Sequence, residues 1–72
     1  MKYDYTKLRQ KFIEKKLTQS EAGARAGIRS SLFSMKLSSQ VEFKQSEIFA
    51  LCKLLGIPDK QINEYFFVLE VQ

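Results

Sequence analysis

A guanidinium, three hydroxyls and a thioether lie within one short stretch of the chain, residues 29–35. At about 100° per residue of a helix, Ser31, Ser34 and Met35 turn to one side, and Arg29 and Ser30 stand at its leading end. A guanidinium can donate two hydrogen bonds to a guanine edge, whereas a serine hydroxyl bonds to nearly any base. The stretch can therefore bind a polar surface, but with little power to select a base sequence.

The sequence does not indicate catalytic or metal-binding chemistry. It has no histidine, a single cysteine, no glycine-rich phosphate loop and no acids at metal-ligand spacing. Glu14, Glu42 and Glu47 are interpreted as surface counter-charges, and Cys52 as a buried thiol on an apolar helical stripe. We predict that the protein is not an enzyme and that it uses no cofactor, no metal and no small-molecule substrate.

Length and composition predict one small folded domain over residues 1–72. Hydrophobic residues make up 44% of the chain and charged residues 28%, which is typical of a folded domain and not of a disordered tail. No apolar run approaches the roughly 18 residues that span a bilayer, and the first residues lack a signal-peptide segment. We expect a cytoplasmic protein without a membrane partner.

Charge is distributed unevenly along the chain, whose net charge is +4. Residues 1–44 hold ten Lys or Arg against four acids, a balance of +6, and residues 45–72 hold two against four, a balance of −2. A basic segment of this kind favours a polyanion as the partner, with a merely solvated basic face as the alternative.

Apolar spacing and turn residues predict an all-α fold of five helices. The expected ranges are residues 5–16, 19–26, 30–38, 46–55 and 59–66. Thr18 and Glu21 have the spacing of a capping box at the start of the second helix, and Gly27 ends it, because glycine accepts positive φ. The small Ala22 and Ala26 of this helix leave space that we expect three aromatic residues to fill: Phe12, Phe33 and Phe49.

The last residues, Phe67-Val68-Leu69-Glu70-Val71, are predicted to form a strand or a short extended tail. An apolar, β-prone edge of this kind pairs readily, either with residues 2–4 of the same chain or with a second chain. We predict that the tail packs, and that a homodimer, if one forms, uses it.

Residues 18–38 have the features of two helices that cross steeply over a tight turn. Such a unit needs a glycine at the bend, a small residue where the backbones approach, and apolar inner faces. Gly27 supplies the bend and Gly23 supplies the small residue one turn earlier. The inner faces come from Ala22, Ala26, Ile28 and Phe33.

This unit resembles the helix-turn-helix of the phage Cro and repressor (XRE) family, whose usual string is close to L-T-Q-x-x-x-A-x-x-x-G-V-S-x-x-x-[IL]-S. The matching positions here are Leu17, Thr18, Gln19, Gly23, Gly27, Ile28, Arg29, Phe33 and Ser34. The resemblance extends over the whole chain and implies a five-helix, lambda-repressor-like DNA-binding domain with a short extended C-terminal tail. One departure is Arg29 in place of the usual serine or threonine, which weakens the helix cap. This suggests an anionic partner for Arg29, with a surface cation that has no specific partner as the alternative.

Four further segments, KYDYTKL, KQSEI, LLGIP and YFF, are similar to those of small prophage regulators from Gram-positive bacterial hosts. That group includes Cro-like proteins and modulators that bind the partner phage repressor.

Docking as in the Cro and repressor family places the third helix in the major groove of DNA. The expected base-facing residues are Arg29, Ser30, Ser31, Ser34 and Met35. The expected phosphate contacts are Gln19, Lys36, Ser38, Ser39, Gln40 and Lys44. We therefore expect a transcriptional regulator of a phage or prophage that binds double-stranded operator DNA.

The same residues support a second hypothesis. A surface of small hydroxyls with Met35 and Leu32 exposed is adaptable and partly apolar, as protein interfaces are. The protein would then be an antirepressor that covers the DNA-binding face of a phage repressor. The basic first part of the chain favours DNA, whereas the weak set of base-contacting side chains favours a protein partner, so the sequence leaves both hypotheses open.

Overall fold

The computed structural model describes residues 2–71 and agrees with the prediction of five α-helices. The helices are α1 (Thr6–Glu14), α2 (Gln19–Arg25), α3 (Ser30–Leu37), α4 (Gln45–Leu55) and α5 (Ile62–Phe66), and a short 3-10 helix, η1 (Asp59–Gln61), precedes α5. The expected fifth helix is thus divided between η1 and α5. None of the helices in this range is long and apolar enough to cross a membrane.

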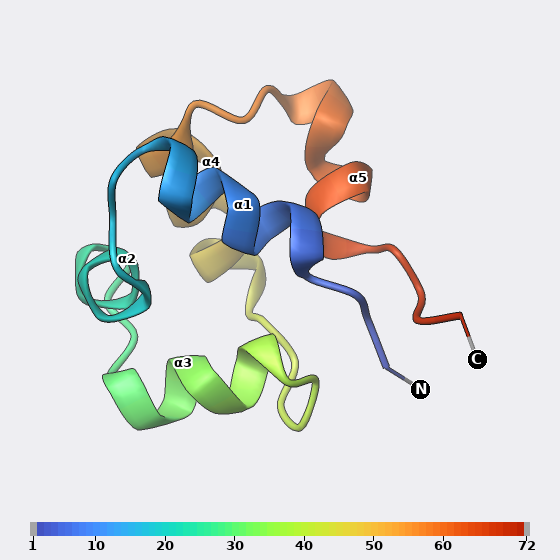
Figure 1. Ribbon diagram of the computed structural model, residues 1–72, viewed down its shortest axis with the longest axis horizontal. Helices are drawn as coiled ribbons and strands as arrows, with labels where there is room; N and C mark the ends of the chain where they lie inside the picture. Colours follow the sequence, from blue (N-terminus) through green and yellow to red (C-terminus); the bar gives the residue numbers. More distant parts are fainter. Residues whose placement is uncertain (1, 72) are drawn as a thin grey trace.

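Helix α3 lies along one edge of the molecule (Figure 1). Helix α1 crosses the middle with α4 behind it, α2 stands at one end of α3, and α5 occupies the opposite upper side (Figure 1). The two ends of the chain come together at the side away from α2. One whole side of α3 therefore faces away from the rest of the chain.

The signals that start and end α2 form as predicted. The Thr18 side chain accepts a hydrogen bond from the Glu21 backbone N–H at 3.1 Å, and the Glu21 carboxylate accepts one from the Thr18 N–H at 3.0 Å. Gly27 follows the helix with φ +78°, a conformation that costs glycine little. At the start of α3, the Arg29 side chain makes no capping hydrogen bond, which agrees with the weakened cap expected there.

One partly buried aromatic residue that the sequence prediction missed packs against the core. Phe43, from the loop between α3 and α4, packs edge-on against three buried rings, with centroid distances of 5.3, 6.0 and 5.5 Å to Tyr5, Phe33 and Phe66. The prediction that Phe49 fills the core is wrong, because its side chain is 53% exposed. Phe49 lies on the face of α4 opposite the buried Leu51 and so points outward.

The C-terminal tail packs against the start of the same chain, which was one of the two expected pairings. Tyr3 and Leu69 form an antiparallel bridge. The Asp4 N–H donates to the Val68 carbonyl at 2.7 Å, and the Glu70 N–H donates to the Lys2 carbonyl at 2.9 Å. The tail is thereby held beside the N-terminal segment.

Candidate functional site

The position of α3 depends on a close approach to α2 at Gly23. A Cβ atom added to Gly23 would lie 2.7 Å from Cδ2 of Phe33 and 3.1 Å from the carbonyl oxygen of Ile28. The Ile28 N–H also donates to the Gly23 carbonyl at 2.8 Å across the turn. Only glycine leaves room for the Phe33 ring, which confirms the role predicted for Gly23.

The inner face of α3 carries a charge. Phe33, Lys36 and Leu37 are its buried residues, and the Lys36 side chain is only 1% exposed. The Lys36 ammonium pairs with the carboxylate of Glu47 in α4 and lies 6.0 Å from the centroid of the Phe43 ring. The prediction that Lys36 contacts DNA phosphate is therefore wrong, since its charge is enclosed and already paired.

Glu47 links α3 to the start of α4. Besides pairing with Lys36, its carboxylate accepts a hydrogen bond from the Lys44 backbone N–H at 2.8 Å. Burial alone would raise the pKa of Glu47, but the hydrogen bonds from Lys36 and Lys44 and the charges of those lysines outweigh it, so the pKa lies below its usual value. Glu47 is thus an internal partner and not the surface counter-charge that the sequence suggested.

The outer face of α3 is open to solvent. All five residues expected to contact bases are exposed: Arg29, Ser30, Ser31, Ser34 and Met35. Met35 is 40% exposed, and Leu32 beside it is half-buried. The structure thus turns these side chains outward, while their contact with bases stays a prediction.

The residues expected to contact phosphate do not all remain available. The Ser39 hydroxyl accepts a hydrogen bond from the Tyr3 N–H at 2.9 Å and donates one to the Tyr3 carbonyl at 3.2 Å. Ser39 therefore anchors the N-terminal segment, which corrects its predicted role as a phosphate contact. Four other members of the predicted set are exposed: Gln19, Ser38, Gln40 and Lys44.

The Ser38 hydroxyl donates to the Met35 carbonyl at 3.1 Å and accepts from the Gln40 amide at 2.9 Å. Although both Ser38 and Gln40 are exposed, their polar groups are partly used by each other. Gln19 and Lys44 are the members of the predicted phosphate set with no side-chain hydrogen bond within residues 2–71.

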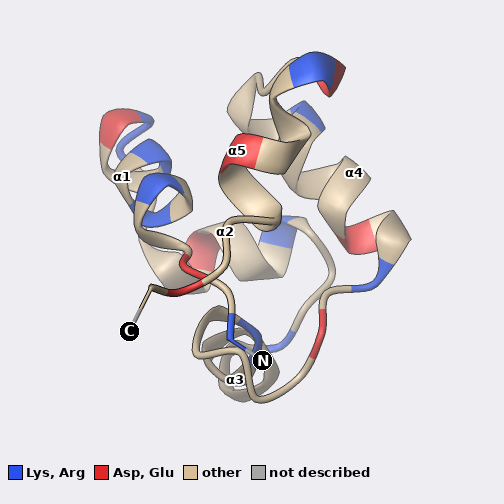
Figure 2. Cartoon of the chain, turned by 90° about the vertical axis from the view of Figure 1, so that its right-hand side faces the viewer, with Lys and Arg blue, Asp and Glu red and all other residues tan. Residues whose placement is uncertain are grey.

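Charge surrounds α3 but does not cover its outer face. Lys36 is the only charged residue between Ser30 and Leu37, and it is buried. Figure 2 shows α3 nearly end-on with little colour on its coil, whereas α1 carries repeated basic segments. At the end of α3 the Arg9 guanidinium donates to the Leu37 carbonyl at 3.3 Å, a favourable place for a cation at a helix C-terminus. The candidate site is thus a neutral, hydroxyl-rich helix face with a cation, Arg29, at its leading end.

Sequence reasoning missed the internal pairing of Lys36, although a signal for it exists. Phe33, Lys36 and Leu37 are spaced by three and four residues, so they share one side of a helix. Two of the three are large and apolar, which places Lys36 on the buried side. Within residues 2–71, no group of three or more His, Cys, Asp or Glu side chains is arranged to hold a metal ion.

Two comparisons with known proteins give matches. Residues 1–68 match a family model described as "Protein of unknown function (DUF739)". The solved structures include the solution structure of the modulator of repression of the temperate bacteriophage TP901-1 from Lactococcus lactis, which is 33% identical to this chain. That match covers 100% of this chain and 97% of the other, with a TM-score of 0.79. No curated protein matches the chain.

These matches support the narrower resemblance seen in the sequence, to small phage regulators with modulators among them. They do not confirm membership of the Cro and repressor family.

Proposed function

The chain belongs to the DUF739 family, and from its likeness to a phage modulator of repression we propose that it is a phage regulatory protein that modulates repression by binding the phage's repressor. It would do so in the cytoplasm of the bacterial host, with the outer face of α3 as the contact surface. This was the second of the two hypotheses that the sequence left open.

The observation that carries the proposal is the neutral outer face of α3. Each bidentate contact between a side chain and a base supplies about 1–3 kcal/mol of discrimination. Arg29 is the one residue of the exposed face that can form such a contact, because Lys36 is buried and paired with Glu47. A helix in this position with a single cation is poorly equipped to select an operator.

The same face suits a protein surface. The serine side chains are short, so a partner helix can approach closely, and their hydroxyls can donate or accept hydrogen bonds. Met35 adds a flexible apolar contact at the flank of the face, with Leu32 half-buried at its side. Protein interfaces likewise combine apolar contacts with polar groups.

The test is the formation of a complex with the repressor of the same phage. We expect the two purified proteins to elute together in size-exclusion chromatography with light scattering, and we expect this protein to change the mobility shift that the repressor gives with its operator. Met35→Glu places a charge on the apolar flank of the face and should weaken repressor binding at least tenfold, measured by calorimetry.

A matched control is Asn63→Glu, which adds the same charge at an exposed position of α5, across the molecule from α3 (Figure 1). This variant should bind the repressor as the unmodified protein does. The proposal fails if the proteins form no complex, or if Met35→Glu binds as well as Asn63→Glu.

Operator DNA is a second candidate partner for the same face. The net charge of +4, the exposed Arg29 and the exposed Lys44 and Gln19 favour it. This candidate predicts a mobility shift of operator DNA without the repressor, with affinity that falls steeply as salt is raised. Arg29→Ala would weaken that shift. A shift that needs the repressor would exclude this candidate as the primary function.

A further inference from the structure

The N-terminal segment and the C-terminal tail pair through one antiparallel β-bridge, and the two outer edges of this pair differ. The two hydrogen bonds of the pair join Asp4 to Val68 and Lys2 to Glu70, so they flank the bridge between Tyr3 and Leu69. In this antiparallel pattern the N–H and C=O groups of Tyr3 and Leu69 point away from each other. Each of these two residues therefore directs its backbone groups to an outer edge.

One of the two edges is closed. The Ser39 hydroxyl accepts from the N–H of Tyr3 and donates to its carbonyl. On the other edge, the N–H and C=O of Leu69 make no backbone hydrogen bond within residues 2–71. Leu69 thus offers one donor and one acceptor on the same side of an extended segment.

The tail also exposes apolar side chains on a fixed backbone. Phe67, Leu69 and Val71 are 49%, 49% and 94% exposed. The Phe67 ring packs edge-on against Tyr3 with a centroid distance of 6.2 Å, so the tail is held in place and not merely free. Figure 1 shows it at the side of the molecule away from α2, with no helix covering it.

Edge strands in proteins are usually protected from pairing by lysine, proline, a bulge or a covering element. The tail, residues 67–71, contains no lysine and no proline, and Glu70 is its one charged residue. An uncovered edge without these features pairs readily with another extended segment.

We propose that this edge pairs with the same edge of a second copy of the chain, in an antiparallel arrangement centred on Leu69. An antiparallel pair of identical segments can be centred on one residue that offers both its N–H and its C=O to the same residue of the other chain. Leu69 meets that requirement, and the pairing generates a two-fold symmetric dimer. Dimerisation through the tail does not depend on which partner binds α3.

Charge and side-chain direction favour the symmetric pairing. Antiparallel register about Leu69 sets Glu70 of each copy opposite Val68 of the other, so the two carboxylates do not face each other. Within each chain Glu70 already lies across from Lys2. On the other side of the ribbon the two Leu69 side chains meet.

The size of the contact sets the strength of the dimer. Two tails of five residues bury less than the roughly 1,200 Å² of total surface found in stable complexes. The dimer is therefore weak and reversible, and it forms at high protein concentration.

The test is sedimentation equilibrium of the full chain over a wide concentration range, without any other phage protein. The average molecular mass should rise from that of the monomer toward that of the dimer as the protein concentration increases. Leu69→Pro removes the outward N–H but keeps the Val68 and Glu70 bonds within the chain, so it should weaken association at least tenfold while circular dichroism stays unchanged. Leu69→Lys should do the same, because two lysines would face each other at the centre.

A mixture of Leu69→Lys with Leu69→Glu should restore association, since opposite charges then meet across the two-fold axis. Ile13→Lys is the matched control, because Ile13 is a 76% exposed apolar residue of α1 and should not affect the mass. The proposal is overturned if the unmodified chain stays monomeric at millimolar concentration, if Leu69→Pro associates as strongly as the unmodified chain, or if the mixture stays monomeric.

Discussion

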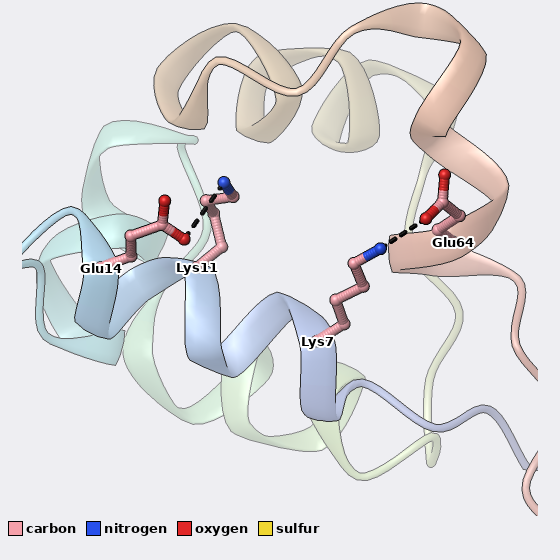
Figure 3. A network of polar contacts seen from close by, with 4 residues as sticks. All are labelled: Lys7, Lys11, Glu14 and Glu64. Atoms are coloured by element: carbon pink, nitrogen blue, oxygen red, sulfur yellow. Dashed lines mark hydrogen bonds and ion pairs between the residues drawn. The ribbon is translucent and has the colours of Figure 1, made fainter.

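Two lysine–glutamate pairs each join two helices, but one is enclosed and the other is open to water. Lys36 and Glu47 join α3 to α4 with side chains that are 1% and 12% exposed. Lys7 and Glu64 join α1 to α5 at 2.5 Å with side chains that are 46% and 51% exposed (Figure 3). Both pairs consist of the same chemical groups, so their exposure to water decides how much each pair contributes to the stability of the fold.

Water replaces a partner at the open pair but not at the enclosed one. Loss of one member of an exposed pair returns the other to solvent at little cost, whereas loss of one member of a buried pair leaves an uncompensated charge. Lys7 also has an alternative contact, the Tyr65 ring, whose centroid lies 4.9 Å from its ammonium. The comparison indicates that the position of α3 depends on an ion pair, while the contact between α1 and α5 depends on apolar packing.

The largest expected effect comes from removing one half of the enclosed pair. Lys36→Ala leaves the Glu47 carboxylate without its charged partner and opens a cavity under α3, so we expect a loss of about 3–5 kcal/mol in the free energy of unfolding. Urea denaturation measures it. For a domain of this length such a loss is a large part of the total stability.

A double variant separates charge from volume. Lys36→Met together with Glu47→Gln removes both charges and keeps most of the packing, so it should be much more stable than Lys36→Ala alone. If the double variant and Lys36→Ala lose the same free energy of unfolding, the unpaired charge of Glu47 is not the cause of the loss in Lys36→Ala.

The next largest effect should come from the apolar contact that holds α3 against α2. Gly23→Ala forces a Cβ atom against the Phe33 ring and the Ile28 carbonyl, which should cost about 1–3 kcal/mol. Thermal unfolding followed by circular dichroism checks it. Ala24→Ser, at the neighbouring exposed position of α2, should change the melting temperature much less.

Acid should weaken the enclosed pair through Glu47. Its pKa in the folded protein lies below the usual value, which is about 4.3 for glutamate in model peptides. The resulting stabilisation is therefore fully present above about pH 5 and is lost as the pH falls through the folded pKa. Glu47→Gln should flatten this part of the stability profile, measured by urea denaturation at a series of pH values. If the free energy of unfolding of that variant still falls at low pH as it does in the unmodified protein, the acid sensitivity comes from other carboxylates.

The smallest effect is expected at the open pair. Lys7→Ala should leave the melting temperature within experimental error at physiological salt, since both side chains are already hydrated. Lys11 and Glu14 pair at 3.2 Å within α1 (Figure 3), with side chains that are 18% and 64% exposed, so this pair is only partly open to water. If Lys7→Ala lost as much stability as Lys36→Ala, burial would not be what distinguishes the two ion pairs.

Most of the fold was predictable because its signals are local. The Thr18 and Glu21 capping box, the glycine after α2 and the apolar spacing of Tyr5, Leu8 and Phe12 act within a few residues of one another. The outward direction of Ser31 and Met35 followed from helical periodicity in the same way. Periodicity also placed Lys36 on the inner side, but its charge led to the wrong interpretation.

Residues one or two turns apart were enough to predict the helices, the capping of α2, the close approach at Gly23 and the polar outer side of α3. Long-range packing was needed to establish that Lys36 meets Glu47 and that Phe43, not Phe49, packs against the core. It was also needed to show that Ser39 closes one edge of the terminal pair while Leu69 leaves the other open. These outcomes depend on which helices and segments pack together, and such contacts between distant residues leave no periodic signal along the chain.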